Sequence, residues 1–258
     1  MDYTAILALA SGVGFILFGN YLEGGHIDSL IQPTAALIVL GGTLGATWLA
    51  ATPAEVKLLF KLLPRLVKPG LADRKKTAED LLKIANVVRR DGMLAAEGQL
   101  ASINDPLLRR GLQMLVDGTT IEEVRNIIET EIDLTEHHGS AAAKLFETAG
   151  GFAPTIGILG AVLGLIHVMQ NLSDPTKLGT GIAVAFVATI YGVGFANMMF
   201  LPIGARLKKI LQAEAEDRGM VLAGLGGIAA GVNGRQLSEI LAPYAGHHDD
   251  PADAKKAA

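Results

Sequence analysis

The sequence predicts an all-α membrane protein with four transmembrane helices in two hairpins and a helical cytoplasmic domain between spans two and three. Three observations support this fold class. Half of the 258 residues are hydrophobic, and only 19% are charged. The charges are also segregated, so that four windows contain no Asp, Glu, Lys or Arg: residues 3–22, 29–54, 148–173 and 178–205. Because about 20 apolar residues in a helix cross a hydrocarbon core, each window is long enough to span a membrane.

The basic residues predict the orientation of these spans. Of the 22 Lys and Arg residues, 14 lie between Thr52 and Glu147, seven follow Gly204, and Lys177 lies between spans three and four. Cytoplasmic flanks of membrane proteins carry the excess of Lys and Arg. We therefore expect the large middle segment and both termini to lie in the cytoplasm.

The windows and their basic flanks also predict the domain boundaries. The first window lacks a preceding basic stretch and a clean cleavage site, so we expect a retained span rather than a signal peptide. The polar tail from His247 onward is expected to be disordered. The expected segments are hairpin 1 at 1–51 (spans about 3–22 and 31–51), a cytoplasmic helical domain at 52–147, hairpin 2 at 148–204 (spans about 148–171 and 180–203), and a cytoplasmic C-terminal helix and tail at 205–258.

The middle segment has the pattern of amphipathic helices. One helix is predicted from a cap at Thr77 to Gly92. A second begins after the turn that ends at Pro106 and runs to Gly118, and a third amphipathic run covers residues 121–136. The charge-free stretch 219–234 is too short and too rich in glycine to span a membrane with assurance. We expect it to form a cytoplasmic helix that packs near the membrane.

Several classes of function are excluded or disfavoured by composition. The chain has no Cys, which excludes disulfides, thiolate metal sites and cysteine nucleophiles. It contains no metal-ligand cluster, nucleophile elbow or phosphate-binding loop, so we expect neither an enzyme nor a cofactor. A formal net charge of -4 gives no sign of a nucleic-acid surface. No span carries an ionisable interior residue of the kind used as proton carriers, and Glu147 lies only at the edge of span three.

Spans three and four contain small residues and prolines at notable positions. Gly157, Gly160 and Gly164 allow close helix approach, either within the hairpin or around a partner helix in an oligomer. Pro154 and Pro202 lie near the cytoplasmic ends of these spans and each removes a backbone hydrogen bond. They indicate either tolerated kinks or a paired hinge that couples the membrane segment to the cytoplasmic domain.

Local motifs throughout the chain resemble those of the MotA family, the larger subunits of the bacterial flagellar motor stator. Together they are specific, whereas each alone would be weak. They are GGH at 24–26 with QP at 32–33, FAPTIGILGAVLG at 152–164, AVAFVATIYG at 183–192, RRDGMLAAE at 89–97 and DPLLRRG at 105–111.

The resemblance implies an ion-conducting stator subunit in the bacterial inner membrane. It implies a homo-pentamer around two copies of a single-span MotB partner whose aspartate carries the proton, and a rotor partner, FliG. Spans three and four would line the inner surface, while spans one and two would face membrane lipid. The absence of a carboxylate within the spans agrees with a carrier on another chain.

The resemblance also assigns roles to individual residues. Arg89 and Glu97 match the charged pair that faces the rotor, and Arg90 shares the assignment because the two arginines are adjacent. The fourth-span threonine of the family corresponds to Thr189. Ala161 stands where sodium-driven relatives have a threonine, which favours protons, although Thr155 offers another oxygen.

One alternative within the same superfamily is an energy-transducing channel subunit of the ExbB or TolQ kind, which serves envelope transport. Those proteins have three spans and a differently placed cytoplasmic block. The fourth charge-free window and the motif at residues 89–97 favour the stator. A passive scaffold and a secondary transporter are further alternatives, but no midplane binding site of the transporter kind is visible.

Overall fold

The computed structural model describes residues 3–173 and 175–245, and within these residues every regular element is a helix. The tail predicted from His247 onward lies outside them. The chain divides into two compact units. The apolar unit comprises Met1–Pro69 with His138–Ile210, and the polar unit comprises Gly70–His137 with Leu211–Ala258.

The apolar unit contains the segments with membrane character. Among the described residues, three helical segments are long and apolar enough to cross a membrane, namely Ile27–Leu49, Ile121–Gln170 and Leu178–Ala229, and a shorter apolar helix covers Ile6–Leu22. The multi-pass, all-helical fold class predicted from the sequence is therefore confirmed at this level.

The first half of the apolar unit is a chain of short elements. They are α1 (Thr4–Leu22), the 3-10 turn η1 (Ile27–Leu30), α2 (Pro33–Ala36), the π-helical η2 (Leu37–Gly41), α3 (Gly42–Leu49), α4 (Pro53–Leu62) and the 3-10 turn η3 (Leu63–Leu66). Helix α4 begins with a capping box, in which the Thr52 hydroxyl accepts from the Glu55 N–H and the Glu55 carboxylate accepts from the Thr52 N–H. These hydrogen bonds lower the pKa of Glu55, the backbone one having the larger effect.

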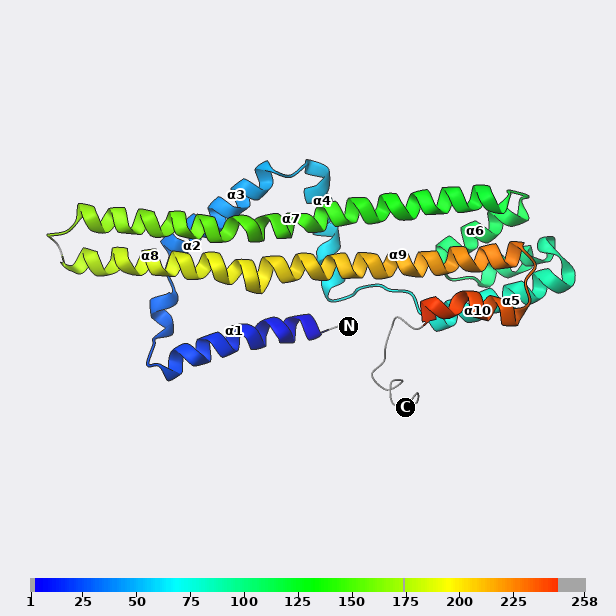
Figure 1. The fold of residues 1–258 in the computed structure, drawn as a ribbon, viewed down its shortest axis with the longest axis horizontal. Helices are drawn as coiled ribbons and strands as arrows, with labels where there is room; N and C mark the ends of the chain where they lie inside the picture. The colour runs from blue at the N-terminus through cyan, green and yellow to red at the C-terminus, as the bar shows by residue number, and fades with distance from the viewer. Residues whose placement is uncertain (1–2, 174, 246–258) are drawn as a thin grey trace. The chain divides into compact units, whose positions relative to one another are not determined.

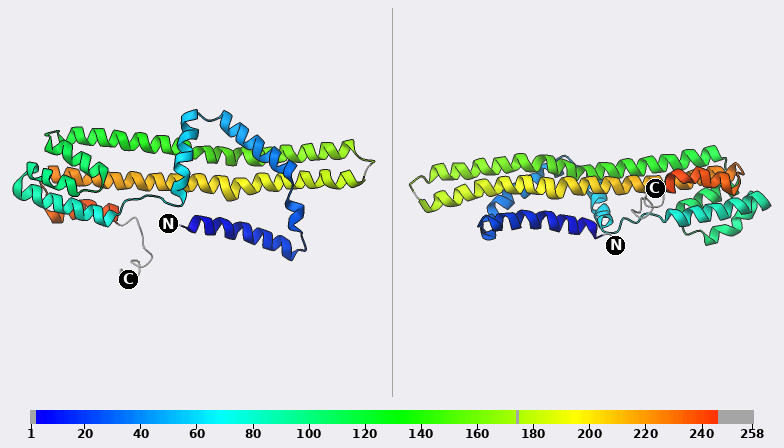
Figure 2. Two further views of the ribbon diagram at one scale, coloured as in Figure 1. Left: turned by 180° about the vertical axis from the view of Figure 1, so that it is seen from behind. Right: turned by 60° about the horizontal axis from the view of Figure 1, so that its bottom comes forward.

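The second half of the apolar unit is an antiparallel hairpin. Helix α7 (Ile121–Gln170) and helix α8 (Pro175–Phe195) run side by side, as Figures 1 and 2 show. Helix α8 continues through the π-helical η5 (Ala196–Phe200) into α9 (Leu201–Ala229). The third amphipathic run and span three, predicted as separate segments, are thus parts of one 50-residue helix.

The polar unit is a cluster of amphipathic helices around one apolar core. It contains α5 (Arg74–Asp91), the 3-10 segment η4 (Met93–Ser102), α6 (Pro106–Val116) and α10 (Gly234–Ala245), with the ends of α7 and α9. Fully buried side chains from each of the α-helices meet there: Leu81, Ile84, Leu108, Leu112, Val124, Ile128, Leu225, Ile228 and Leu237.

One sequence-based expectation in this unit needs correction, and a second gains structural detail. The predicted start of a helix at Thr77 is wrong, because the Asp73 carboxylate accepts from the N–H groups of Lys75 and Lys76 and starts α5 at Arg74. The stretch 219–234 is helical as far as Ala229, but its apolar residues belong to the core of the polar unit. The high glycine content of this stretch made its apolar face difficult to recognise from the sequence. That face is buried against α5 and α6.

Candidate functional site

The α7–α8 hairpin is closed by small residues along a seam. A Cβ added at Gly157 would lie 2.9 Å from the carbonyl oxygen of Ala188, and one added at Gly164 would lie 2.8 Å from the Ala185 nitrogen. At Gly160 the same Cβ would meet the Ala188 side chain at 2.9 Å. The contacts of these three glycines agree with the first alternative, packing within the hairpin, and their packing against a partner chain stays a prediction. They face α8 of the same chain, because only residues without a side chain permit this backbone approach.

The predicted ion-pathway residues lie outside the seam. Thr155 and Thr189 are exposed and Ala161 is half-buried. The Thr155 hydroxyl donates to the Phe152 carbonyl at 2.8 Å, and the Thr189 hydroxyl donates to a carbonyl one turn earlier at 3.2 Å. Each hydroxyl thus uses its proton within its own helix, which leaves oxygen lone pairs on the exposed face of the hairpin.

The two prolines occupy different environments in the apolar unit. Pro154 packs at the seam, since a Cβ added at Gly192 would lie 3.2 Å from its Cα. Pro202 is the second residue of α9 and lies two residues after the end of the π-helical η5. A π-turn widens the helix and accommodates a residue that lacks an N–H. The described contacts do not bring the two prolines together.

The edge of the hairpin carries an ion pair between α7 and α9. The Lys208 Nζ donates to a Glu147 carboxylate oxygen at 2.7 Å, and both side chains are about one-third exposed. Close by, a Cβ added at Gly204 would lie 3.1 Å from the Glu147 side chain. The acid that sequence analysis placed at the edge of span three is therefore paired, and it holds the two helices together where the charge-free windows end.

The predicted rotor-contact residues surround a sharp turn in the polar unit. Arg89 and Arg90 end α5, Gly92 adopts a φ of +84°, and Glu97 lies on η4. A positive φ at this position favours glycine. The three charged side chains are exposed, so the turn presents them on the surface.

The two arginines differ in their partners. The Arg90 guanidinium donates to both carboxylate oxygens of Asp91, at 2.7–3.0 Å. These hydrogen bonds raise the pKa of Arg90 and lower the pKa of Asp91. Within residues 3–173 and 175–245, Arg89 and Glu97 have no hydrogen bond or ion pair from their side chains. Arg89 and Arg90, which the sequence could not distinguish as rotor-contact candidates, therefore differ in whether their charge is paired.

A buried arginine anchors the start of α5. The Arg74 guanidinium donates to Asp217 at 2.5 Å, to Glu216 at 3.1 Å and to the Tyr244 carbonyl at 2.8 Å, and Asp217 also accepts from the Ala72 N–H at 3.0 Å. Burial acts to lower the pKa of Arg74, but its hydrogen bonds to the two carboxylates outweigh burial and raise it. This network ties three helices of the polar unit together.

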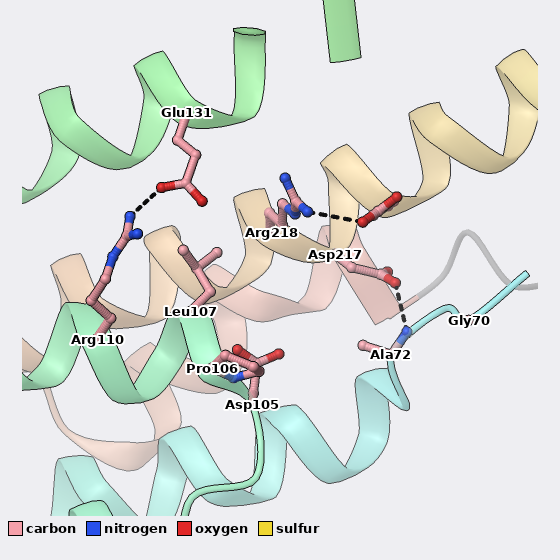
Figure 3. Close-up of a pocket in the computed structure, with 10 residues that line it drawn as sticks. Gly70, Ala72, Asp105, Pro106, Leu107, Arg110, Glu131, Asp217 and Arg218 are labelled. Carbon is pink, nitrogen blue, oxygen red and sulfur yellow. Dashed lines mark hydrogen bonds and ion pairs between the residues drawn. The ribbon is translucent and has the colours of Figure 1, made fainter. Parts of the chain in front are cut away.

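A pocket of about 390 Å³ lies beside this network, lined by both charged and apolar residues (Figure 3). An ion pair joins Arg110 to Glu131, Arg218 is paired with Glu214 at 2.9 Å, and the Asp217 hydrogen bond to Ala72 closes one side. Both arginines of the pocket are therefore already neutralised. In the described residues no three His, Asp or Glu side chains gather as a metal site.

Sequence reasoning missed two residues with clear structural roles. Tyr191 joins α8 to the loop before α2, because its hydroxyl donates to the Leu30 carbonyl at 2.6 Å and accepts from the Gln32 N–H at 3.3 Å. The sequence did offer one sign of this role, since Tyr191 is the single tyrosine in the apolar window 178–205. Arg74 was missed because nothing in the sequence distinguishes it from Lys75 and Lys76, which follow it directly.

Comparison with known proteins defines the class to which this arrangement belongs. Residues 99–220 match the model of the MotA/TolQ/ExbB proton channel family, and residues 7–104 match that of the motility protein A N-terminal region. The structure is similar to that of C. jejuni MotAB (TM-score 0.91, 31% identity, 97% of this chain and 98% of that one). It is also similar to the flagellar MotAB stator complex from Bacillus subtilis (TM-score 0.85, 30% identity, 93% and 95%).

The curated relatives narrow the class to one family. Motility protein A of Helicobacter pylori is 35% identical over 252 residues, which cover 95% of each chain. Motility protein A of Bacillus subtilis is 31% identical, over 95% of this chain and 91% of the relative. The chain belongs to the motility protein A family.

Proposed function

We propose that this chain is the ion-conducting stator subunit of a bacterial flagellar motor and couples proton flow to torque on the rotor. Its role as a stator proton-channel subunit in the inner membrane follows from its family, and its multi-pass helices agree with that. The main support for the coupling mechanism is the α7–α8 hairpin. Its two helices pack closely through glycines, its membrane windows carry no charge, and Thr155 and Thr189 are exposed on its surface. Such a hairpin can line a proton path, but the ionisable carrier has to come from another chain.

The proposed partner is a single-span subunit of the MotB kind. Both solved relatives are MotAB complexes, and windows 148–173 and 178–205 lack any carboxylate. We propose that five copies of this chain surround two partner helices. Thr155, Ala161 and Thr189 then face the partner aspartate, while α1 and the segment Ile27–Leu49 face membrane lipid.

We propose a four-span topology with both termini in the cytoplasm. Helix α1 forms the first span, since Thr4–Leu22 is apolar along its 19 residues, close to the length that a bilayer core needs. The basic residues of 52–147 and 205–258 support the cytoplasmic placement of those segments, and hairpins 1–51 and 148–204 form the membrane part.

Protons are the proposed coupling ion. A sodium ion that sheds its water needs several oxygen ligands, and Ala161 supplies none. The hydroxyls of Thr155 and Thr189 already donate to backbone carbonyls and add only two weak acceptors. Proton transfer to a carboxylate does not require several oxygen ligands around the ion. Each proton that crosses 100 mV releases about 2.3 kcal/mol.

The proposed contact with the rotor protein FliG is made by Arg89 and Glu97. Both are exposed and have no internal ion pair in the described residues, whereas Arg90 is neutralised by Asp91. Exposed charges contribute little to stability and suit the guidance of a moving partner. Pro154 and Pro202 are proposed to transmit the movement of the membrane segment, because each interrupts the hydrogen-bond ladder of a helix that continues into the polar unit.

Gene deletion followed by complementation tests this proposal. Deletion should abolish swimming while filaments still assemble, and the wild-type gene should restore it. Swimming that persists in a strain without any other stator gene would refute the proposal. Swimming speed should fall with a proton uncoupler and not with sodium removal, and the reverse result would identify a sodium-driven subunit.

The envelope-transport alternative is not favoured. Residues 7–104 match the N-terminal model of motility protein A, so the resemblance to a flagellar subunit extends beyond the channel region shared with ExbB and TolQ. Nutrient uptake across the outer membrane should therefore be normal in the deletion strain.

A further inference from the structure

An apolar recess lies in the apolar unit between α1 and the segment that runs from α8 through η5 to α9. One part, of about 510 Å³, is lined by side chains that include Ile6, Leu66 and Ile203. A second part, of about 260 Å³, extends along α1 and α8. Leu9 and Met198 line both parts, so the two parts adjoin. Its methionines are flexible enough to adapt to an irregular apolar occupant.

Charge is confined to one end of this recess. Arg206 is the single charged residue that lines the first part, and no charged residue lines the second. At the same end, the lining residues Leu66 and Val67 lie between Arg65 and Lys68 in the chain. An occupant that fits is therefore apolar along most of its length and carries negative charge at one end.

The dimensions of the recess match one leaflet of a bilayer. Its lining residues on the α8–η5–α9 segment run from Ile190 to Arg206, which corresponds to roughly 24 Å at 1.5 Å per helical residue. Half of a hydrocarbon core is about 15 Å, and the remaining length corresponds to the headgroup region. Arg206 directly follows the last charge-free window, where a headgroup phosphate would lie.

We propose that the recess binds one anionic phospholipid of the cytoplasmic leaflet. An acyl chain lies between α1 and η5, and the phosphate lies at Arg206. The attraction between anionic lipid headgroups and basic side chains near a membrane surface provides the preference for negative charge. This inference rests on the proposed orientation of the spans, but not on the torque mechanism.

A second copy of the chain is a poorer occupant than a lipid. A helix with its side chains is about 10 Å across. An acyl chain is thinner and follows a bent path. The positive end would also attract an anionic headgroup, whereas an apolar helix from another copy would bring no negative charge to that end.

Native mass spectrometry of the full chain in its membrane complex tests this proposal. The complex is reconstituted in nanodiscs with equal phosphatidylglycerol and phosphatidylcholine, and the lipids that remain bound after release are counted. We expect phosphatidylglycerol to be retained preferentially. Arg206→Gln should reduce that preference about fivefold, and Arg206→Lys should retain it. Lys209→Gln is the matched control, because Lys209 is exposed, carries the same charge and does not line the recess.

A second pair of variants tests the apolar part. A Cβ added at Gly194 meets nothing within 4 Å, and Gly194 lines the recess. Gly194→Leu should therefore occupy the recess and lower retention of both lipids. Gly179→Leu is the control, since Gly179 lies on the same helix with equally open space but away from the recess.

Three outcomes would overturn the proposal: equal retention of the two lipids by the wild type, an equal effect of Arg206→Gln and Lys209→Gln, or no effect of Gly194→Leu. A disulfide between copies that carry Leu17→Cys would identify a second copy as the occupant instead. Swimming is scored separately in the same strains. Motile cells without selective lipid retention would reject the lipid site and leave the stator function intact.

Discussion

At the scale of single residues, the functional surface depends on which side chains are already paired. Arg89 and Arg90 are neighbours with the same formal charge, and both are exposed. Arg90 is bound by Asp91 through two nitrogens, so much of its field is cancelled at a distance. Arg89 keeps its full charge beside the turn at Gly92, and Glu97 does the same on the other side. A rotor protein that binds at this turn, as proposed, would meet one positive and one negative group that have no ion pair within the described residues.

We predict that Arg89→Gln lowers swimming speed much more than Arg90→Gln. The first change removes an unpaired charge, whereas the second removes a charge that Asp91 largely cancels and exposes that carboxylate. The measurement is the rotation speed of tethered cells that express each variant at equal levels. A larger defect in Arg90→Gln would mean that Asp91 releases Arg90 when the rotor binds.

Gly157 shows a different effect of a single residue, because the close packing of α7 on α8 requires a residue without a side chain at this position. We predict that Gly157→Ala lowers the thermal midpoint of the purified protein, since the new Cβ would lie 2.9 Å from a backbone oxygen of α8. Overpacking of this kind costs about 1–3 kcal/mol.

Gly151→Ala is the matched control for that measurement. A Cβ at Gly151 meets nothing within 4 Å, and alanine favours a helix interior over glycine by up to about 1 kcal/mol. This variant should be as stable as the wild type or more so. Equal destabilisation by both substitutions would show that the seam is looser than the close backbone approach indicates.

At the scale of elements, side-chain caps start two helices of the polar unit, and a π-turn lies close to a proline. Asp73 and Asp105 start α5 and α6 by accepting from N–H groups of the first turn. The π-helical η5 ends two residues before Pro202, whose nitrogen provides no hydrogen. In the polar unit, Arg74 then fixes the start of α5 to α9 through Asp217.

We predict that Arg74→Met destabilises the protein by about 3–5 kcal/mol, because it leaves the buried Asp217 carboxylate without its cation. Arg74 and Asp217 side chains are only 7% and 8% exposed. The loss should appear as a lower thermal midpoint and as faster proteolysis within residues 70–137.

The control for this network is an exposed pair on α10. Arg235 and Glu239 side chains are 90% and 69% exposed, so Arg235→Gln should change the midpoint by less than about 1 kcal/mol. Similar effects of the two substitutions would show that the Arg74 network is solvated in the assembled protein.

At the scale of the whole molecule, the membrane topology is the main property to test. The chain has no Cys, so single cysteines can be introduced into a background without competing thiols. We predict that Ser29→Cys is labelled by a membrane-impermeant maleimide in intact cells, because η1 lies in the proposed external loop. Ser102→Cys should be labelled only after the membrane is opened. Labelling of Ser102→Cys in intact cells would show that the orientation is the opposite of the one proposed.

The all-helical, multi-pass fold class, the family resemblance and the charged motif around Gly92 could all be predicted from the sequence. Hydropathy windows and basic flanks are local properties, and local properties can be read along a chain. The resemblance added the identity of the candidate residues, which composition alone would have assigned to a solvated helix face. Family membership was then confirmed by relatives that match nearly the whole chain.

Which residues contact one another could be learned only from the three-dimensional structure. It placed Gly157, Gly160 and Gly164 against α8 of the same chain and separated Arg89 from the neutralised Arg90. It also joined Arg74 to Asp217, 143 positions away, and located the recess beside α1. These facts depend on contacts between distant segments, and the pattern of charge and hydropathy within each segment carries no information about which distant side chain lies opposite.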